Sequence, residues 1–324
     1  MKKPLIVLTG PTAVGKTELS IRLAKLVGGE IISADSMQVY KHMDIGSAKI
    51  MPDEMGGVPH HLVDILEPDE EFHVVKFKAY ADRCIKEIYG RGRIPILVGG
   101  TGFYIQAVLY DIDFTENGED NGFRRELEAL AKDKGNEYLH RMLAEVDAAS
   151  ARQIHANNVK RVIRALEYFH ETGEPISEHN AKERQKESPY QFAYFVLDDR
   201  RDRLYQKIDA RVDRMFADGL VDEVKALKEK GYTRDMVSMQ GLGYKEILSY
   251  LDGECTLEEA VYILKRDTRH FAKRQLTWFR RERDVCRIDK EAFAYDDKEI
   301  LERMVQVLKE RGILDKDGNG YIGE

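Results

Sequence analysis

The feature that most constrains the fold is an eight-residue motif near the N-terminus. Residues 10–17 read GPTAVGKT and match the pattern GxxxxGK[ST] at every fixed position. An apolar run at 5–8 precedes the motif, and apolar residues at helical spacing follow it in 18–26. Glycines let backbone N–H groups turn inward around an anion, and the N-terminus of the following helix adds partial positive charge. The motif therefore predicts a strand, a phosphate-binding turn and a helix, and we call residues 10–17 the phosphate loop.

The side chains of the phosphate loop have separate predicted roles. Lys16 is expected to reach the outer phosphate oxygens, and the Thr17 hydroxyl is expected to ligate Mg²⁺. The predicted diphosphate-binding residues in the loop are Gly10, Pro11, Thr12, Ala13, Val14, Gly15, Lys16 and Thr17. The alternative is an ordinary glycine-containing turn, which requires none of the four matching positions.

Two further apolar runs predict parallel strands that end in polar residues. Residues 30–34 lead to Asp35, and residues 94–98 lead to a glycine run that contains Thr101. Ligands of open parallel sheets lie outside the carboxyl ends of the strands, so both side chains are expected near the phosphate loop. Asp35 could accept a proton, or it could only cap the segment that follows. Glycines stand after the second run where many NTPases have an acidic Mg²⁺ anchor, which counts against ATP hydrolysis.

Patterns along the chain predict four segments. They are the first part of a P-loop core at 1–118, an all-helical insertion at 119–188, a second part of the core with a basic helix at 189–290, and a C-terminal helix with a polar tail at 291–324. Within the insertion, helical patterns occur at 123–132, 136–145, 147–154 and 159–171, without a strand signal. Beyond it, the patterns predict a strand at 190–197 and helices at 201–218, 220–230 and 257–283. The predicted fold class is α/β: a P-loop NTPase-like parallel sheet flanked by helices, with an all-helical insertion domain.

Composition limits the compartment and the class of partner. The chain has 51 Lys and Arg against 58 Asp and Glu, a net charge of −7, so bulk charge does not indicate a protein that coats nucleic acid. Its three cysteines are far apart, so neither a disulfide framework nor a paired metal motif is predicted. The apolar run at 5–8 is too short for a signal peptide or a membrane span. A cytoplasmic protein is expected.

Local charge nevertheless predicts a polyanionic partner. Residues 265–287 contain nine Lys or Arg and three Asp or Glu, a local charge of +6, with aromatic residues interleaved. Two smaller basic patches lie in 152–164 and in 200–214. Each patch alone could be a solvated helix face. Three patches with nearby aromatic residues favour RNA, because cations track its backbone and aromatic rings stack on unpaired bases.

Two motifs that could hold a metal are assigned structural roles. His60 and His61 are adjacent within an irregular loop predicted at 47–70, and adjacent side chains point in different directions. The tail from Asp315 resembles an EF-hand loop, but the chain ends at Glu324, before the bidentate glutamate that such a loop needs. We expect a polar tail there.

The motifs together resemble a known family, the bacterial tRNA dimethylallyltransferases (tRNA isopentenyltransferases). The matching segments are GPTAVGKT at 10–17, ADSMQVYK at 34–41, GGTGFY at 99–104, VKRVIRALE at 159–167, RLYQKIDARVDRM at 203–215, QGLGYKE at 240–246 and AKRQLTWFRR at 272–281. They occur in order across residues 4–285. The chain departs from the family pattern at Asn158, where an Asp is expected, and in the variable form of residues 240–242. The zinc-finger extension of eukaryotic relatives is absent from this sequence.

The resemblance implies a reaction and its catalytic residues. The phosphate loop would hold dimethylallyl diphosphate, and the acceptor would be the N6 amine of the adenine on the 3′ side of the anticodon, position 37. Asp35 would act as the general base. Lys16, Arg211 and Mg²⁺ on Thr17 would stabilise the departing diphosphate, and Thr101 would orient the amine or a phosphate oxygen.

The resemblance also implies how the RNA is held. The adenine would flip into a pocket lined by Asp35, Ser36, Met37 and Gln38. The anticodon stem-loop would contact Thr101, Arg124, Lys160, Arg161, Val162, Ile163, Arg164, Lys273, Arg274, Gln275, Trp278, Arg280 and Arg281.

Two alternatives use the same motifs. A nucleotide or small-molecule kinase would share the phosphate loop and could use Asp35 as a base on a hydroxyl, but it leaves the glycine run and the basic helix unexplained. An RNA-binding module with a vestigial nucleotide fold would bind tRNA without turnover.

Overall fold

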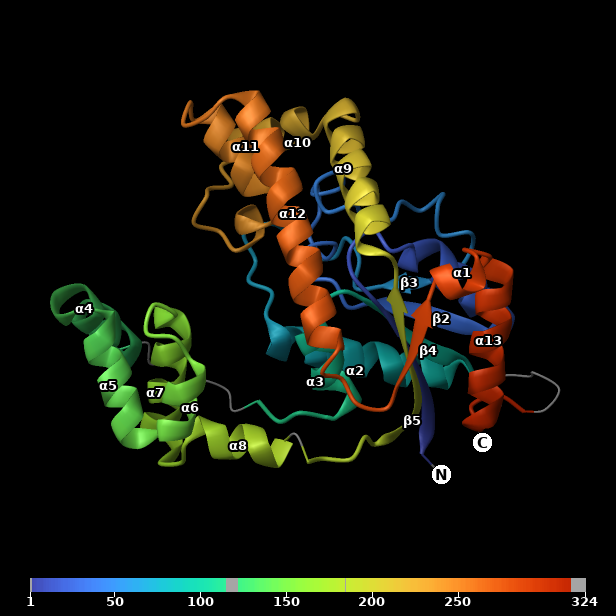
Figure 1. The fold of residues 1–324 in the computed structure, drawn as a ribbon, viewed down its shortest axis with the longest axis horizontal. Helices are drawn as coiled ribbons and strands as arrows, with labels where there is room; N and C mark the ends of the chain where they lie inside the picture. The colour runs from blue at the N-terminus through green and yellow to red at the C-terminus, as the bar shows by residue number, and fades with distance from the viewer. Residues whose placement is uncertain (1, 115–121, 184, 316–324) are drawn as a thin grey trace. The chain divides into compact units, whose positions relative to one another are not determined.

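The chain forms two compact units in the computed structural model, which describes residues 2–114, 122–183 and 185–315 (Figure 1). The core unit comprises Met1–Leu109 and Ser188–Glu324, and the helical unit comprises Tyr110–Glu187. The insertion predicted at 119–188 falls on the helical unit, which begins earlier than that prediction, at Tyr110. Residues 316–324 of the EF-hand-like tail lie outside the described residues.

A six-stranded parallel sheet forms the centre of the core unit, in the order β3-β2-β4-β1-β5-β6. The strands are β1 (Lys3–Thr9), β2 (Gly29–Ser33), β3 (His60–His61), β4 (Ile94–Gly99), β5 (Tyr190–Asp198) and β6 (Val285–Asp289). The four predicted strands are confirmed as β1, β2, β4 and β5, which are largely apolar because both faces of a parallel sheet are covered. The sequence did not predict β3, inside the loop at 47–70, or β6.

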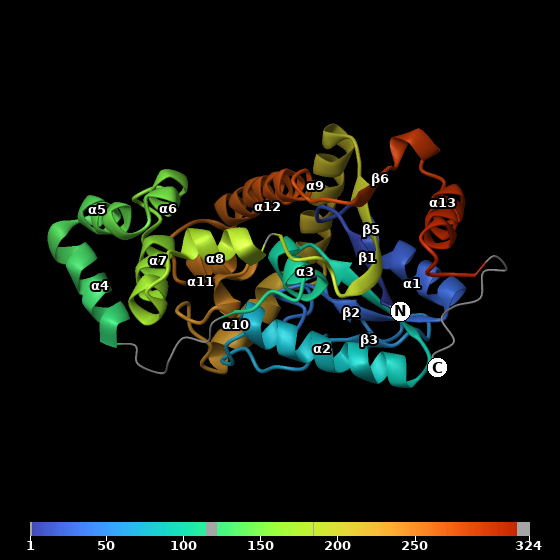
Figure 2. The same ribbon diagram turned by 90° about the horizontal axis from the view of Figure 1, so that it is seen from below.

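Helices cover both faces of this sheet (Figure 2). The helices of the core unit are α1 (Lys16–Val27), α2 (Val74–Gly90), α3 (Gly102–Leu109), α9 (Arg201–Ala217), α10 (Leu220–Glu229), α11 (Tyr244–Leu251), α12 (Leu257–Phe279) and α13 (Asp297–Glu310). One apolar cluster joins α1 and α13 to the sheet face that carries Ile6, Leu8 and Ile96. Side chains alternate between the two faces of a strand, and α2 and α3 pack on the opposite face.

The helical unit has an apolar core of its own. It contains α4 (Gly122–Lys134), α5 (Asn136–Val146), α6 (Ala148–Gln153), α7 (Val159–Thr172) and α8 (Ile176–Glu183). Leu127, Leu139, Leu143 and Leu166 are buried together in it. The described residues of this unit include no strand, as predicted, whereas α8 was not predicted.

None of the helices in the described ranges is both long enough and apolar enough to cross a lipid bilayer.

Candidate active site

The phosphate loop links the end of β1 to the start of α1. Gly10 has a φ of +148°, and a Cβ at this position would lie 2.6 Å from the carbonyl oxygen of Leu197, so only glycine fits. Gly15 caps the N-terminus of α1 with a φ of +98°. These two glycines turn the backbone so that the positive end of α1 faces the concave side of the loop. The local geometry is that of an anion-binding turn.

Lys16 curls back over the phosphate loop. Its Nζ donates to the carbonyl oxygens of Gly10, at 2.9 Å, and Pro11, at 2.7 Å. Burial and, to a smaller extent, the charge of Arg211 lower the pKa of Lys16 to about 7, although the carboxylate of Asp35 opposes both effects. A lysine with so low a pKa lies where a bound anion would restore its usual charge.

Arg211 reaches the same loop from α9. Its Nη1 lies 3.5 Å from the Thr12 Oγ1. Burial, followed by repulsion from Arg214, lowers the pKa of Arg211. The structure therefore brings Lys16 and Arg211, which are far apart in the sequence, to one side of one turn. Two cations held this close favour a ligand with more than one negative charge.

Asp35 and Thr101 meet at the carboxyl ends of β2 and β4. The Thr101 N–H donates to the carbonyl oxygen of Ala34 at 3.2 Å, which holds the two predicted residues on adjacent strand ends. The Asp35 Oδ1 accepts from the N–H groups of Met37 at 2.8 Å and Gln38 at 3.3 Å. Asp35 thus does cap the segment after β2. Within the described part of the chain no hydrogen bond to its Oδ2 is formed, so one carboxylate oxygen remains for a substrate.

Gln275, on the buried face of α12, joins the phosphate loop to the glycine run. Its Oε1 accepts from the Thr12 N–H at 2.8 Å, and its Nε2 donates to the carbonyl oxygen of Gly100 at 3.1 Å. A Cβ at Gly100 would lie 2.2 Å from that Nε2. The prediction that Gln275 contacts RNA is therefore corrected, since both ends of its side chain are used inside the protein.

Trp278 packs against the start of α3. A Cβ at Gly102 would lie 2.1 Å from the indole Nε1, and the ring meets Phe103 edge to face with centroids 6.4 Å apart. One turn further, burial raises the pKa of Glu282 to about 7 although Gln106 donates a hydrogen bond to it. The half-buried indole thus has one side fixed by α3.

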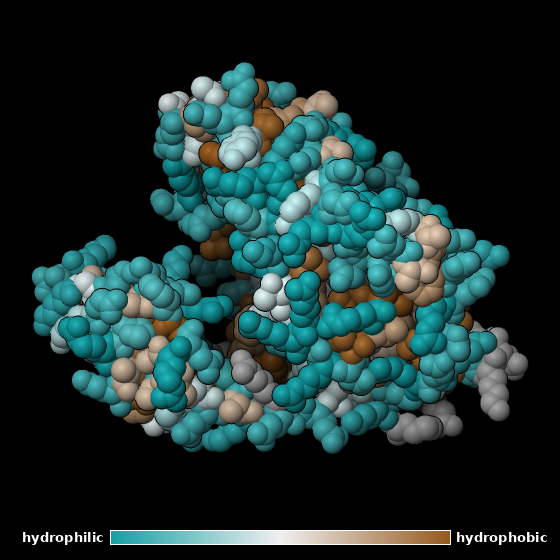
Figure 3. Space-filling view, viewed as in Figure 1, coloured by the Kyte–Doolittle hydropathy of each residue, from teal (hydrophilic) through white to brown (hydrophobic). Residues whose placement is uncertain are grey.

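A basic groove of about 450 Å³ follows the C-terminal half of α12. It is lined by His270, Lys273, Arg274, Thr277, Trp278 and Arg281, on a largely hydrophilic surface (Figure 3). The helix ends at Phe279 and not at residue 283 as predicted, so Arg280, which is its C-cap, and Arg281 lie outside it.

Two acidic residues of α9, Asp209 and Asp213, pair with basic residues in the first half and at the middle of α12. Arg269 donates from Nη1 to both carboxylate oxygens of Asp209, at 2.7 and 2.8 Å. Lys265 forms an ion pair with one carboxylate oxygen of Asp213. The predicted basic face therefore divides into a paired half and an exposed half.

The helical unit separates the predicted RNA contacts into two groups. Lys160 and Arg161 are exposed, whereas Val162 is fully buried and Ile163 is 4% exposed. The predicted RNA contacts of Val162 and Ile163 are therefore wrong, because both side chains form the apolar core of this unit. Arg124 is partly exposed and forms a two-point ion pair with the buried carboxylate of Glu167, at 2.8 and 2.7 Å.

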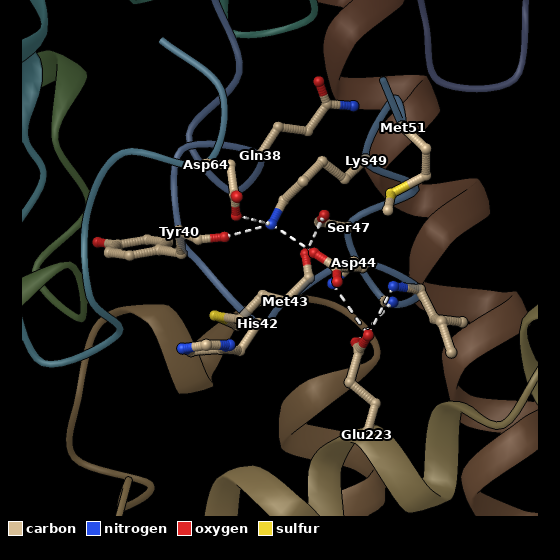
Figure 4. A network of polar contacts seen from close by, with 12 residues as sticks. Gln38, Tyr40, His42, Met43, Asp44, Ser47, Lys49, Met51, Asp64 and Glu223 are labelled. Atoms are coloured by element: carbon tan, nitrogen blue, oxygen red, sulfur yellow. Dashed lines mark hydrogen bonds and ion pairs between the residues drawn. The ribbon is translucent and has the colours of Figure 1, made fainter. Parts of the chain in front are cut away.

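A polar network that the sequence did not reveal holds the loop after Asp35 (Figure 4). The carboxylate of Glu223, on α10, accepts from the N–H groups of residues 44–46 at 2.9, 2.7 and 3.0 Å and from the Tyr244 O–H at 2.8 Å. The buried Lys49 donates to Asp64 and to the Tyr40 carbonyl oxygen. Gln38 donates to the Ala48 carbonyl oxygen at 3.0 Å. The predicted adenine pocket is thus attached to a rigid loop.

Comparisons with known proteins identify the family of the chain. Residues 38–282 match the family model of the IPP transferases. The tRNA dimethylallyltransferase of Lachnoclostridium phytofermentans is 64% identical over 96% of this chain and 99% of its own. The full-length tRNA isopentenylpyrophosphate transferase of Bacillus halodurans superposes with a TM-score of 0.72 at 46% identity, covering 96% of this chain and 98% of that one. A eukaryotic dimethylallyltransferase acting on tRNA gives a TM-score of 0.81 at 30% identity, covering 94% of this chain and 78% of that one. The chain belongs to the IPP transferase family.

Proposed function

We propose that this chain transfers a dimethylallyl group from dimethylallyl diphosphate to the N6 amine of the adenine 3′ of the anticodon in tRNA. The observation that carries the proposal is the convergence of Lys16 and Arg211 on the phosphate loop, with the charge of Asp35 close enough to affect Lys16. One end of the site is suited to a diphosphate and the other to a group that loses a proton. The reaction is expected in the cytoplasm, with all three cysteines free.

The diphosphate end stabilises a leaving group. Backbone N–H groups of the phosphate loop, Lys16 and Arg211 would neutralise the oxygens as the C–O bond breaks. Thr17, exposed in the first turn of α1, fits as the protein ligand of Mg²⁺. Among the described residues no cluster of three or more His, Cys, Asp or Glu could hold a metal, so most ligands of the ion would be substrate oxygens and water. Bound Mg²⁺ would supply further positive charge to the diphosphate.

The acceptor end activates a weak nucleophile. The lone pair of an adenine amine is delocalised into the ring, so the amine must lose a proton as it attacks. In the proposed step the N6–C1 bond forms, the C1–O bond of the donor breaks, the proton passes to Asp35 and diphosphate leaves. Thr101 orients the amine, and Ser36, Met37 and Gln38 line the pocket of the flipped base.

The RNA grip would come from exposed cations on both units. In the core unit they are Lys273, Arg274, Arg280 and Arg281, and in the helical unit they are Lys160 and Arg161, with the partly exposed Arg164 one turn further along α7. Such contacts with phosphates make affinity depend on salt.

Substitution of Asp35 tests the reaction directly. Single-turnover transfer from labelled dimethylallyl diphosphate to unmodified tRNA should fall by about 10²–10⁴ in Asp35→Asn, the usual contribution of a general base. Asp222→Asn, which removes an exposed carboxylate on α10, is the control and should transfer at the wild-type rate. A loss of less than about threefold in Asp35→Asn would show that another group accepts the proton.

The same assay separates the alternatives. ATP consumption without RNA would support a kinase, and tRNA binding without any prenyl incorporation would support an RNA-binding module. Family membership favours neither.

A further inference from the structure

Lys290 lies beside the phosphate loop, on a loop that the family motifs quoted above do not include. It follows β6, and its N–H donates to the carbonyl oxygen of Asp198 at 3.1 Å. Its side chain is only 9% exposed, and its Nζ donates to Asp297, the first residue of α13, at 3.1 Å. A nearly buried ammonium that pairs with Asp297, at the carboxyl end of a parallel strand, is placed where ligands of such sheets bind.

The ammonium of Lys290 is next to Gly15. A Cβ built on Gly15 would lie 3.3 Å from the Lys290 Nζ. Gly15 is the N-cap of α1, where the phosphate loop presents its backbone to an anion. Lys290 is therefore a third cation at the phosphate loop, after Lys16 and Arg211, and it comes from a different element.

The loop that carries Lys290 has a well-defined conformation. Ala294 and Tyr295 both have positive φ values, 48° and 63°. The Tyr295 N–H donates to the Lys290 carbonyl oxygen at 2.9 Å, and the Arg203 guanidinium lies 3.7 Å from the centre of the Tyr295 ring. Residues hold such backbone angles only when their surroundings fix them, so Lys290 is presented on a rigid support.

Strand order assigns Lys290 to one end of the donor. In the order β3-β2-β4-β1-β5-β6, β2 and β6 lie on opposite sides of β1, each beyond one intervening strand. Neighbouring strands are about 4.8 Å apart, so each lies about 10 Å from β1. The reactive carbon of the donor must point toward Asp35, after β2. The terminal phosphate then points the other way, toward the loop after β6.

We propose that Lys290 is a diphosphate-binding residue that contacts the terminal phosphate of the prenyl donor and exchanges its bond with Asp297 for that contact. The three hydrogens of an ammonium on a flexible stem allow the exchange. This inference rests on the proposed function and assigns the β6 side of the same site.

Binding of inorganic diphosphate to the full chain, measured by calorimetry, tests the assignment. Lys290→Met should weaken binding by about 10- to 100-fold, the loss expected for one charge-assisted hydrogen bond. Lys290→Arg should recover most of the affinity. Asp297→Asn should tighten binding, because it removes the anion that competes for Lys290 and repels the phosphate. In transfer assays, Lys290→Met should raise KM for the donor and leave KM for tRNA unchanged.

The changes in diphosphate affinity in Lys290→Met and Asp297→Asn have opposite signs only if Lys290 binds the ligand. If Lys290 only braces the loop through its pair with Asp297, Lys290→Met and Asp297→Asn will weaken binding alike. That result would overturn the proposal, and so would an unchanged affinity in Lys290→Met. The double variant Lys290→Met/Asp297→Asn should bind diphosphate more weakly than Asp297→Asn alone. That result would show that repulsion by an unpaired Asp297 does not explain all of the affinity lost in Lys290→Met. A wild-type chain that binds no diphosphate would refute the proposed function itself, whereas one that binds and transfers normally leaves only Lys290 in question.

Discussion

Raising the pH from 6 to 8 should weaken the binding of inorganic diphosphate, because Lys16 loses its proton in the free protein. The pKa of this lysine is about 7, through burial and the nearby charge of Arg211. A bound diphosphate raises that pKa toward its ordinary value of about 10.4, since an opposite charge favours the charged form. The contribution of Lys16 to affinity is therefore nearly complete at pH 6 and declines as the pH rises through 7.

The size of the effect follows from these two pKa values. At pH 8 about nine tenths of the free protein has a neutral Lys16, so binding should take up close to one proton and the affinity should be about tenfold lower than at pH 6. Calorimetry in buffers of different ionisation enthalpy measures that uptake. Diphosphate itself titrates in this range, so the comparison is with Lys16→Arg, whose side chain stays charged. Equal proton uptake by both proteins would refute the reasoning.

Four further substitutions test the packing of the two units and the predicted RNA contacts. Gly102→Ala should destabilise the core unit by about 1–3 kcal/mol in denaturant unfolding, because the new Cβ would lie 2.1 Å from the Trp278 Nε1. Val162→Ala should lower the free energy of unfolding by about 1–3 kcal/mol, because it creates a cavity. Lys160→Ala should leave that free energy unchanged and lower tRNA affinity. If Val162→Ala instead lowered tRNA affinity without changing stability, Val162 would be an RNA contact after all. Glu223→Ala should lower the melting temperature and raise KM for tRNA, because it removes the acceptor of the N–H groups of residues 44–46. An unchanged KM would show that this loop does not support the adenine pocket.

The fold was predictable wherever a segment carries its own signal. Continuous apolar runs predicted the central strands, because both faces of those strands are buried. β6 was missed because Val285–Asp289 is mostly half-exposed or exposed and lies inside a basic segment. α8, Ile176–Glu183, lacks an apolar stripe and could not be recognised from periodicity. The end of α12 was placed too late because no glycine or proline marks it, and Arg280 caps it instead.

The site was predictable to the extent that its parts are local motifs. The phosphate loop is continuous in sequence, so its geometry follows from eight residues. Gln275 was misassigned because its partners, Thr12 and Gly100, are distant in sequence, and nothing short of the fold shows that contact. Val162 and Ile163 are a different case. The 3.6-residue period of α7 already places them on the face opposite Lys160 and Arg161. A segment that resembles an RNA-binding segment of the family therefore contains both exposed and buried residues.

The glycines after β4 bear on the reaction class, because the lack of a side chain at each lets neighbouring elements pack closely. A Cβ at Gly99 would lie 2.2 Å from the carbonyl oxygen of Ala34, and one at Gly100 would meet Gln275. The run therefore permits the strand end that carries Asp35 to lie directly against β4 and lets α12 hold the phosphate loop. An acidic residue at either position, as in a hydrolytic NTPase, would push these elements apart. The proposed general base, Asp35, then comes from β2, beyond the strand beside β1. A group there is displaced from the bound phosphates by about two strand spacings, or about 10 Å, which leaves room between them for the acceptor amine and the C1–O bond of the donor. Such spacing suits proton removal from an amine that attacks C1 of the donor better than activation of water against phosphorus.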